Sequence, residues 1–177
     1  MSKVMRVTGG SGGIGRAIVK QAVERDYAVC VHYRAQREKA EAVVREALGR
    51  GGKAIAVQGD AASEDDMVRL FETMDRELGR IDVLVNNVGV LGWQGRIVDC
   101  NAEKLNRLWA VNVTSYFLCA REAVKRMSTA SGGKGGVIVN VSSIAGRRGG
   151  RDRRIHYATS KGAINTFTLG LAKEVAA

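Results

Sequence analysis

The sequence contains no proline, whereas an average usage of about 5% would give about nine. It has three cysteines and two histidines, and no two of them are spaced as in a CxxC pair or a Cys–His zinc motif. We therefore expect reduced thiols, no disulfide framework and no metal site. No stretch approaches 18 consecutive apolar residues, so we expect no membrane span. Residues 1–6 lack the apolar segment of a secretory signal, which predicts a cytoplasmic protein.

The sequence has few acidic residues relative to basic ones, with 18 Asp and Glu against 28 Lys and Arg and a formal net charge of +10. Such an excess can indicate a nucleic acid or an anionic ligand. The charge is scattered, except for five arginines within residues 147–154, and that segment lacks the aromatic side chains on which bases stack. We expect no nucleic-acid partner. The remaining composition, 45% apolar and 26% charged, is that of a globular protein, and the length suits a single domain over residues 1–177.

Short runs rich in valine and isoleucine alternate with longer segments of helical periodicity. We expect strands at residues 4–8, 28–33, 53–58, 81–86 and 137–141. We expect helices at residues 14–25, 38–49, 63–79, 103–127 and from 157 to the end, with Ser63 capping the third of them and Gly79 ending it. This alternation predicts an α/β fold with a doubly wound, Rossmann-like parallel sheet in the strand order 3-2-1-4-5.

A glycine-rich loop at residues 8–15 reads Thr-Gly-Gly-Ser-Gly-Gly-Ile-Gly, between the first expected strand and the first expected helix. Its Gly-x-Gly-x-x-Gly spacing fits the dinucleotide fingerprint, because glycines let the backbone approach a pyrophosphate and the helix start supplies free N–H groups. The second strand ends at Tyr33-Arg34 without the carboxylate that binds the ribose of NAD. Arg34 can meet a 2′-phosphate instead, which favours NADP(H) and leaves NAD possible, unless Arg34 merely begins a solvated helix.

Tyr157 and Lys161 are four residues apart on the last expected helix and so share a face. A nearby ammonium lowers the pKa of a tyrosine, which can then exchange a proton with an alcohol or carbonyl oxygen. By itself a Tyr-x-x-x-Lys pair would indicate no more than a structural contact. Here the expected buried strand at residues 137–141 also delivers Ser142 and Ser143 at its carboxyl end, where α/β sheets place their sites.

Over its whole length the chain resembles the short-chain dehydrogenase/reductases, with local wording typical of the bacterial sugar- and keto-reductase-like branch. The resemblance rests on the loop at residues 8–15, on Asp60-Ala61, on residues 86–89 (Asn-Asn-Val-Gly, with Val where the family has Ala) and on a catalytic tetrad, namely Asn112, Ser143, Tyr157 and Lys161. It implies that the cofactor is bound by Gly9, Ser11, Gly12, Gly13, Ile14, Gly15, Tyr33, Arg34, Asp60, Ala61, Asn87, Val88, Gly89, Tyr157 and Lys161.

The resemblance also implies hydride transfer between the nicotinamide of NADP(H) and a small alcohol or carbonyl substrate. Tyr157 would donate or accept the proton, and Lys161 would bind the nicotinamide ribose and lower the pKa of Tyr157. Ser143 would stabilise the charge on the substrate oxygen, with Ser142 as the adjacent alternative. Asn112 would hold a water molecule that relays protons.

The family's pattern continues beyond Ala177, so we expect the usual sixth and seventh strands and the substrate lid to be missing. Residues 137–141 would then form a sheet edge, and turnover would be weak or absent. The alternative function is a truncated, catalytically weak or inactive nucleotide-binding or interaction protein. The arginines at 147–154 either select an anionic substrate or form a solvated loop. A homodimer or homotetramer through residues 103–127 and 157–177 is implied by the resemblance alone.

Overall fold

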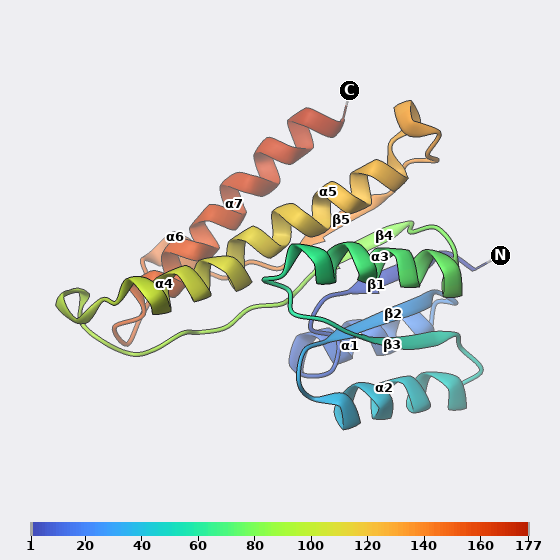
Figure 1. Ribbon diagram of the computed structural model, residues 1–177, viewed down its shortest axis with the longest axis horizontal. Coiled ribbons are helices and arrows are strands. Elements are labelled where there is room, and N and C mark those ends of the chain that lie inside the picture. Colours follow the sequence, from blue (N-terminus) through green and yellow to red (C-terminus); the bar gives the residue numbers. More distant parts are fainter. Residues whose placement is uncertain (1, 177) are drawn as a thin grey trace.

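The computed structural model describes residues 2–176, which contain a five-stranded parallel sheet (Figure 1). The strands run in the order β3-β2-β1-β4-β5, which confirms the predicted fold class and strand order. Val7 of the central strand pairs with Val31 on one side and with Val85 on the other. The five strands are β1 (Val4–Val7), β2 (Ala28–Tyr33), β3 (Ala54–Gln58), β4 (Val83–Asn86) and β5 (Val137–Asn140).

Helices cover both faces of the sheet, and each face has its own apolar core (Figure 1). On one face, α1 (Gly13–Val23) and α2 (Arg37–Gly49) pack against the valines of β1 and β2. On the other face, α3 (Glu64–Leu78) and α5 (Ser115–Met127) pack against the alternate side chains of the same strands. Strands buried on both faces are continuous apolar runs, which explains why the sequence identified them.

The start and end of α3 follow the predicted local chemistry. The Ser63 hydroxyl accepts a hydrogen bond from the backbone N–H of Asp66 at 3.3 Å, as an N-cap does. Gly79 follows the helix with φ of 94°, a conformation in which a side chain would be strained. The helix therefore begins and ends where the sequence predicted.

The helix predicted at residues 103–127 is present, and it contains a π-helical turn that the sequence did not predict. The segment consists of α4 (Ala102–Trp109), a π-helical turn at Ala110–Thr114 and α5. A π-turn inserts one residue into the helical repeat, and such insertions are common at functional sites. Here the turn contains Asn112, whose side chain is completely buried.

The last helix, α7 (Ile155–Val175), begins two residues before the predicted Tyr157. It packs against α6 (Ala145–Arg148), α4 and the π-turn, and these elements extend beyond the sheet in Figure 1. Short 3-10 turns at Ile97–Asp99 and Thr129–Ser131 complete the helical elements. Within residues 2–176, no helix has the length and apolar character needed to cross a membrane.

The predicted burial of β5 was wrong, whereas its position at a sheet edge was predicted correctly. Val137 and Val139 are 56% and 45% exposed, because β5 is the last strand in the sheet order and pairs with β4 alone. Cys30 and Cys119 are buried, whereas Cys100 is exposed.

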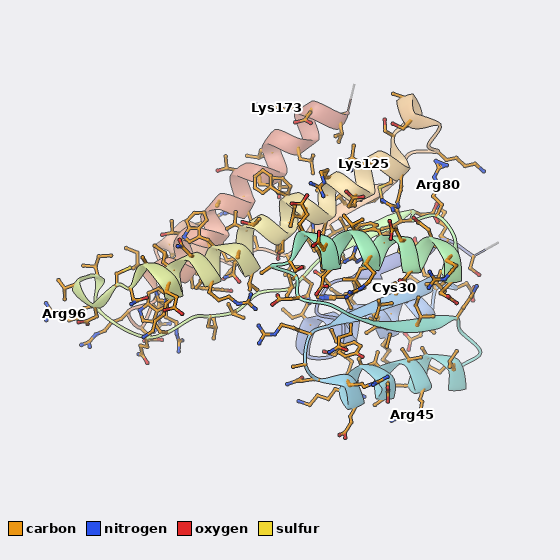
Figure 2. The ribbon with its side chains drawn as sticks, viewed as in Figure 1. Cys30, Arg45, Arg80, Arg96, Lys125 and Lys173 are labelled. Atoms are coloured by element: carbon orange, nitrogen blue, oxygen red, sulfur yellow. The ribbon has the colours of Figure 1, made fainter. Side chains whose placement is uncertain are left out.

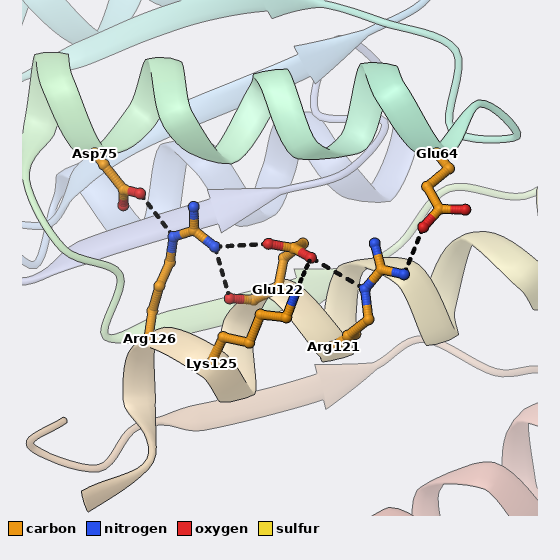
Figure 3. A network of polar contacts seen from close by, with 6 residues as sticks. All are labelled: Glu64, Asp75, Arg121, Glu122, Lys125 and Arg126. Carbon is orange, nitrogen blue, oxygen red and sulfur yellow. Dashed lines mark hydrogen bonds and ion pairs between the residues drawn. The ribbon is translucent and has the colours of Figure 1, made fainter. Parts of the chain in front are cut away.

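An ion-pair network joins α5 to α3 (Figure 3). At its centre Glu122, 4% exposed, accepts hydrogen bonds from Arg126, Lys125 and Arg121 at 2.9–3.0 Å. Both arginines also form ion pairs with acidic side chains of α3 at 2.6 Å. Arg126 pairs with Asp75, and Arg121 pairs with Glu64. The hydrogen bonds hold the pKa of Glu122 below its usual value, although burial acts in the opposite direction. The network therefore fixes α5 against the helix beside it.

Candidate active site

The glycine loop lies between β1 and α1 and leaves open space above its backbone. A Cβ atom at Gly15 would collide with the carbonyl oxygen of Gly9, so this close approach requires glycine. Gly9 and Gly13 have φ of +64° and +53°. No atom lies within 4 Å of the Cβ positions of Gly12 and Gly13, and no side chain caps the first N–H groups of α1. The loop therefore presents free backbone donors to an anion.

Hydrogen bonds join the loop to the segment that follows β4. The Thr8 hydroxyl accepts from the backbone N–H groups of Asn87 and Val88 at 2.8 and 3.0 Å. The Asn87 amide donates to the carbonyl oxygens of Thr8 and Gly9 at 2.8 and 3.2 Å. The Gly9 and Asn87 positions predicted to bind a cofactor therefore belong to one hydrogen-bonded unit.

His32 was not predicted from the sequence as a site residue, and it holds the glycine loop through a hydrogen bond. This buried imidazole accepts from the Gly9 N–H through Nδ1 at 3.2 Å and donates from Nε2 to the Gly59 carbonyl oxygen at 2.9 Å. The bond accepted at Nδ1 requires the neutral ring, because a protonated Nδ1 has no lone pair to accept with. Burial, followed by the positive charge of Arg6, lowers the pKa of His32 to about 4. A histidine in an expected strand gave no sequence signal for this contact.

Four of the residues predicted to bind the cofactor, at the ends of β2 and β3, differ in whether their side chains reach solvent. Arg34 is exposed at the end of β2, and none of the ion pairs within residues 2–176 includes it. Asp60 accepts from Arg107 at 2.8 Å, and this bond together with a backbone N–H lowers its pKa against the effect of burial. The side chains of Tyr33 and Ala61 are 5% and 3% exposed and lie in the two apolar cores. Any contact that these two make with a ligand at the loop would come from their backbone.

Lys161 lies at the carboxyl ends of β4 and β5. Its side chain is 3% exposed, and its ammonium donates to the Val141 carbonyl oxygen at 2.8 Å and to the Tyr116 hydroxyl at 3.2 Å. Burial lowers the pKa of Lys161 to about 8. Tyr157 lies one turn earlier on α7, and no hydrogen bond within residues 2–176 involves its hydroxyl. The Tyr157 hydroxyl is therefore available to a ligand, and the Lys161 ammonium is held by the end of β5 and by Tyr116.

Tyr116 is a second residue that the sequence analysis missed. It is completely buried, and its hydroxyl lies 3.1 Å from the Val88 carbonyl oxygen and 3.0 Å from that of Val141. Burial, with a smaller contribution from Tyr157, raises its pKa above the usual value, so the hydroxyl stays protonated. Tyr116 thereby connects the ends of two strands to Lys161. In the sequence it was indistinguishable from a core aromatic residue.

The two serines after β5 have different hydrogen bonds. Ser142 donates its hydroxyl proton to the Lys161 carbonyl oxygen at 2.9 Å, which ties it to α7. Ser143 accepts from the Ala145 N–H at 3.2 Å, so its own proton remains free for another acceptor. This difference favours Ser143 over Ser142 as the donor to a substrate oxygen.

The Asn112 side chain is hydrogen-bonded to two parts of the chain. Its carbonyl oxygen accepts from the Val90 N–H at 2.8 Å, and its amide donates to the Val90 carbonyl oxygen at 2.9 Å and to the Ser160 hydroxyl at 3.1 Å. Asn112 therefore holds the chain after Gly89 against α7. Its carbonyl oxygen retains a second lone pair, which can accept a further hydrogen bond.

The site contains the residues for acid–base chemistry without a metal cluster. Nowhere in residues 2–176 do three or more His, Cys, Asp or Glu side chains gather closely enough to hold a metal ion. The glycine loop, the chain after β4 and the serines after β5 all lie at the carboxyl edge of the sheet, where Asn87 and Lys161 connect them. Parallel α/β sheets bind ligands at this edge.

Comparisons with known proteins agree with this arrangement. The family model described as short chain dehydrogenase matches residues 3–177. The uncharacterized oxidoreductase YgfF of Escherichia coli is 46% identical over 171 residues, which cover 97% of this chain and 69% of that protein. Elsinochrome reductase 1 of Elsinoe fawcettii is 35% identical over 96% of this chain and 61% of its own length. The chain thus spans about two thirds of the length of the relatives it matches.

Solved structures are similar over the same part. A short-chain dehydrogenase/reductase from Serratia marcescens superposes with a TM-score of 0.91 at 34% identity, covering 98% of this chain and 69% of that one. A short chain dehydrogenase from Burkholderia cenocepacia, solved in complex with NADP, gives 0.90 at 30% identity with the same coverage. Both the family model and the relatives establish that this chain belongs to the short-chain dehydrogenase family.

Proposed function

We propose that the chain carries the cofactor site and the catalytic residues of an NADP(H)-dependent oxidoreductase acting on a small alcohol or carbonyl compound. The observation that carries this proposal is the position of Lys161. Its buried ammonium, on the helix that carries Tyr157, donates to the Val141 carbonyl oxygen at the end of β5, two residues before Ser143, whose hydroxyl donates no hydrogen bond within residues 2–176. The named relatives support the reaction class, because they include a 3-oxoacyl-[acyl-carrier-protein] reductase of Synechocystis at 34% identity.

The residues fit a phosphorylated dinucleotide. The open space above Gly12 and Gly13 and the uncapped start of α1 suit a pyrophosphate. Arg34, free of ion pairs at the end of β2, suits a 2′-phosphate, for which a guanidinium is the preferred partner. The complexes of two neighbours with NADP and NADPH support the same cofactor. When bound, the nicotinamide supplies or accepts the hydride.

The protein's own residues supply the proton and the charge stabilisation. Tyr157 donates a proton to the substrate oxygen during reduction and accepts it during oxidation. Lys161, one turn later on the same helix, would bind the hydroxyl groups of the nicotinamide ribose. Ser143 donates its free hydroxyl proton to the same substrate oxygen and stabilises the charge that develops there. Asn112 positions the chain after Gly89 that borders this space.

The cofactor half of the proposal is tested by calorimetric titration of the purified chain with NADPH and, separately, NADH. We expect tighter binding of NADPH, and we expect Arg34→Gln to weaken it by about tenfold or more while NADH binding is unchanged. Arg45→Gln, which changes an exposed α2 arginine, is the matched control and should alter neither affinity. Equal binding of NADPH by wild type and Arg34→Gln would remove the argument for a 2′-phosphate contact.

The catalytic half is tested by NADPH oxidation with a panel of small ketones and an acetoacetyl thioester. Tyr157→Phe should retain NADPH affinity and lose about 10²–10⁴-fold in turnover, the range expected for a general acid. Tyr27→Phe is the matched control, because no hydrogen bond within residues 2–176 involves its hydroxyl. Tight NADPH binding without turnover of any panel member would favour the alternative of a nucleotide-binding protein.

A further inference from the structure

The Tyr116 hydroxyl, at the start of α5, contacts three polar groups that come from three parts of the chain. It lies 3.1 Å from the Val88 carbonyl oxygen, which follows β4, and 3.0 Å from the Val141 carbonyl oxygen, which follows β5. It also accepts a hydrogen bond from the Lys161 ammonium of α7 at 3.2 Å. The Tyr116 side chain is completely buried, so solvent does not compete for these contacts. The proposed function gives this hydroxyl no role.

The Lys161 ammonium keeps its positive charge and one free donor. An ammonium has three N–H donors and no acceptor. Within residues 2–176, two acceptors meet those donors, the Val141 carbonyl oxygen at 2.8 Å and the Tyr116 hydroxyl. Both acceptors are neutral, and no ion pair in that part of the chain includes Lys161. A polar ligand that supplies a further acceptor would therefore stabilise this buried cation.

The missing side chain of Gly89 leaves space beside the ammonium. A Cβ atom at Gly89 would lie 3.4 Å from Lys161 Nζ and 3.6 Å from Asn112 Oδ1. Gly89 is not among the glycines with positive φ, so its backbone conformation does not itself require glycine. Gly89 is exposed, whereas the Lys161 side chain is buried. A ligand would therefore approach the ammonium from the side of Gly89.

Two residues that are four positions apart hold the chain on either side of Gly89. Asn112, in the π-helical turn, binds the N–H and the carbonyl oxygen of Val90. Tyr116, in the first turn of α5, has its hydroxyl within hydrogen-bond distance of the Val88 carbonyl oxygen. The hydroxyl that meets the ammonium therefore also helps to fix the segment that borders the space beside it.

We propose that Tyr116 is a positioning residue for the nicotinamide half of the cofactor. Its hydroxyl and the Val141 carbonyl oxygen take two donors of the Lys161 ammonium, so that the third faces the space beside Gly89, where the ribose hydroxyls of that half bind. The inference rests on the proposed function, which assigns this ribose to Lys161. A neutral hydroxyl suits the role, because a carboxylate in its place would cancel the charge of the ammonium. Tyr116 acts through Lys161 and is not itself a catalytic residue.

The experiment separates the two halves of the cofactor by calorimetric titration of the full chain. NADPH is compared with adenosine 2′,5′-bisphosphate, which carries the adenine ribose and its 2′-phosphate but has no nicotinamide ribose. Tyr116→Phe keeps the buried ring and removes the hydroxyl alone. We expect it to weaken NADPH binding by about tenfold and to change bisphosphate binding by less than about twofold. Tyr27→Phe, which removes a hydroxyl that has no hydrogen bond within residues 2–176, is the matched control and should change neither affinity.

A double-mutant cycle tests whether Tyr116 acts through Lys161. Lys161→Met should weaken NADPH binding by about tenfold or more, and adding Tyr116→Phe to it should cost less than about twofold more. A merely structural role would persist in the Lys161→Met background and would weaken both ligands. Either of those results, or an unchanged NADPH affinity of Tyr116→Phe, overturns this inference, while binding of both ligands by wild type leaves the proposed function intact. Binding of neither ligand by folded wild type overturns the proposed function, and this inference with it.

Discussion

Arg6 lies in the middle of β1 with its side chain completely buried, a costly position for a charged group. Its Nη2 donates to the Met67 sulfur at 3.4 Å, whereas Nε and Nη1 have no partner within residues 2–176. The guanidinium lies 4.1 Å from the centroid of the Phe71 ring. None of the ion pairs among the described residues includes Arg6. Replacement by an apolar side chain of similar length should therefore stabilise the fold.

The expected gain for Arg6→Met follows from these contacts. Two buried nitrogens without acceptors cost about 1–3 kcal/mol each, and the cation–π contact with Phe71 offsets up to about 2 kcal/mol. Methionine retains most of the packing against Met67 and Phe71. We expect the free energy of unfolding to rise by about 3 kcal/mol, which corresponds to about 6–12 °C in Tm for a chain of this size.

The assay is urea unfolding followed by far-UV circular dichroism, with the midpoint and the m-value fitted separately. The midpoint should rise with an unchanged m-value, which identifies a change in stability rather than in the unfolded state. Arg45→Met, at an exposed position of α2 (Figure 2), is the matched control and should change the free energy by less than about 0.5 kcal/mol. A loss of 1 kcal/mol or more in Arg6→Met would refute the reasoning, since Arg6 would then have an acceptor.

Three further predictions concern the hydrogen bonds around the site. The pKa of His32 is about 4 in the fold and about 6.5 when unfolded, so the unfolded state binds more protons between these values and stability falls as pH drops from 6.5 to 4. His32→Asn should flatten this dependence in urea titrations, and an equally steep loss in the variant would contradict the assignment. Tyr116→Phe removes an acceptor of Lys161, so the pKa of Lys161, measured by NMR of labelled lysine, should fall below about 8; an unchanged value would show that the hydroxyl does not stabilise the ammonium. Glu122→Gln should cost about 2 kcal/mol of unfolding free energy at pH 7. The difference from wild type should shrink as the pH falls through the lowered pKa of Glu122, where the carboxylate is lost, whereas a pH-independent cost would point to packing instead.

The strands and most helices were predictable because their signals are local. Doubly covered strands are uninterrupted apolar runs, and the cap at Ser63 and the stop at Gly79 depend on neighbouring residues alone. The π-helical turn at residues 110–114 was not predictable. Its residues, Ala-Val-Asn-Val-Thr, have ordinary helical periodicity, and the Asn112 hydrogen bonds to Val90 that accompany the turn join residues 22 positions apart in the sequence.

Some residues of the candidate site were likewise predictable from local sequence, and others were not. Residues that belong to motifs, such as Gly15 and Lys161, were found from their spacing. His32, Tyr116 and Arg6 were not, because their contacts are with groups 23 to 61 positions away in the sequence. Tyr33, which the resemblance places in the cofactor site, has its side chain in the core beside α2.

We propose that the glycine loop and Arg34 form an NADP(H) site that Lys161 and Tyr157 can use. The most direct measurement is calorimetric titration of the folded, full 177-residue chain with NADPH, repeated with Arg34→Gln. We expect saturable one-to-one binding that is tighter than that of NADH and weakens by about tenfold or more in the variant. Absence of NADPH binding by protein that is folded by circular dichroism would contradict this proposal.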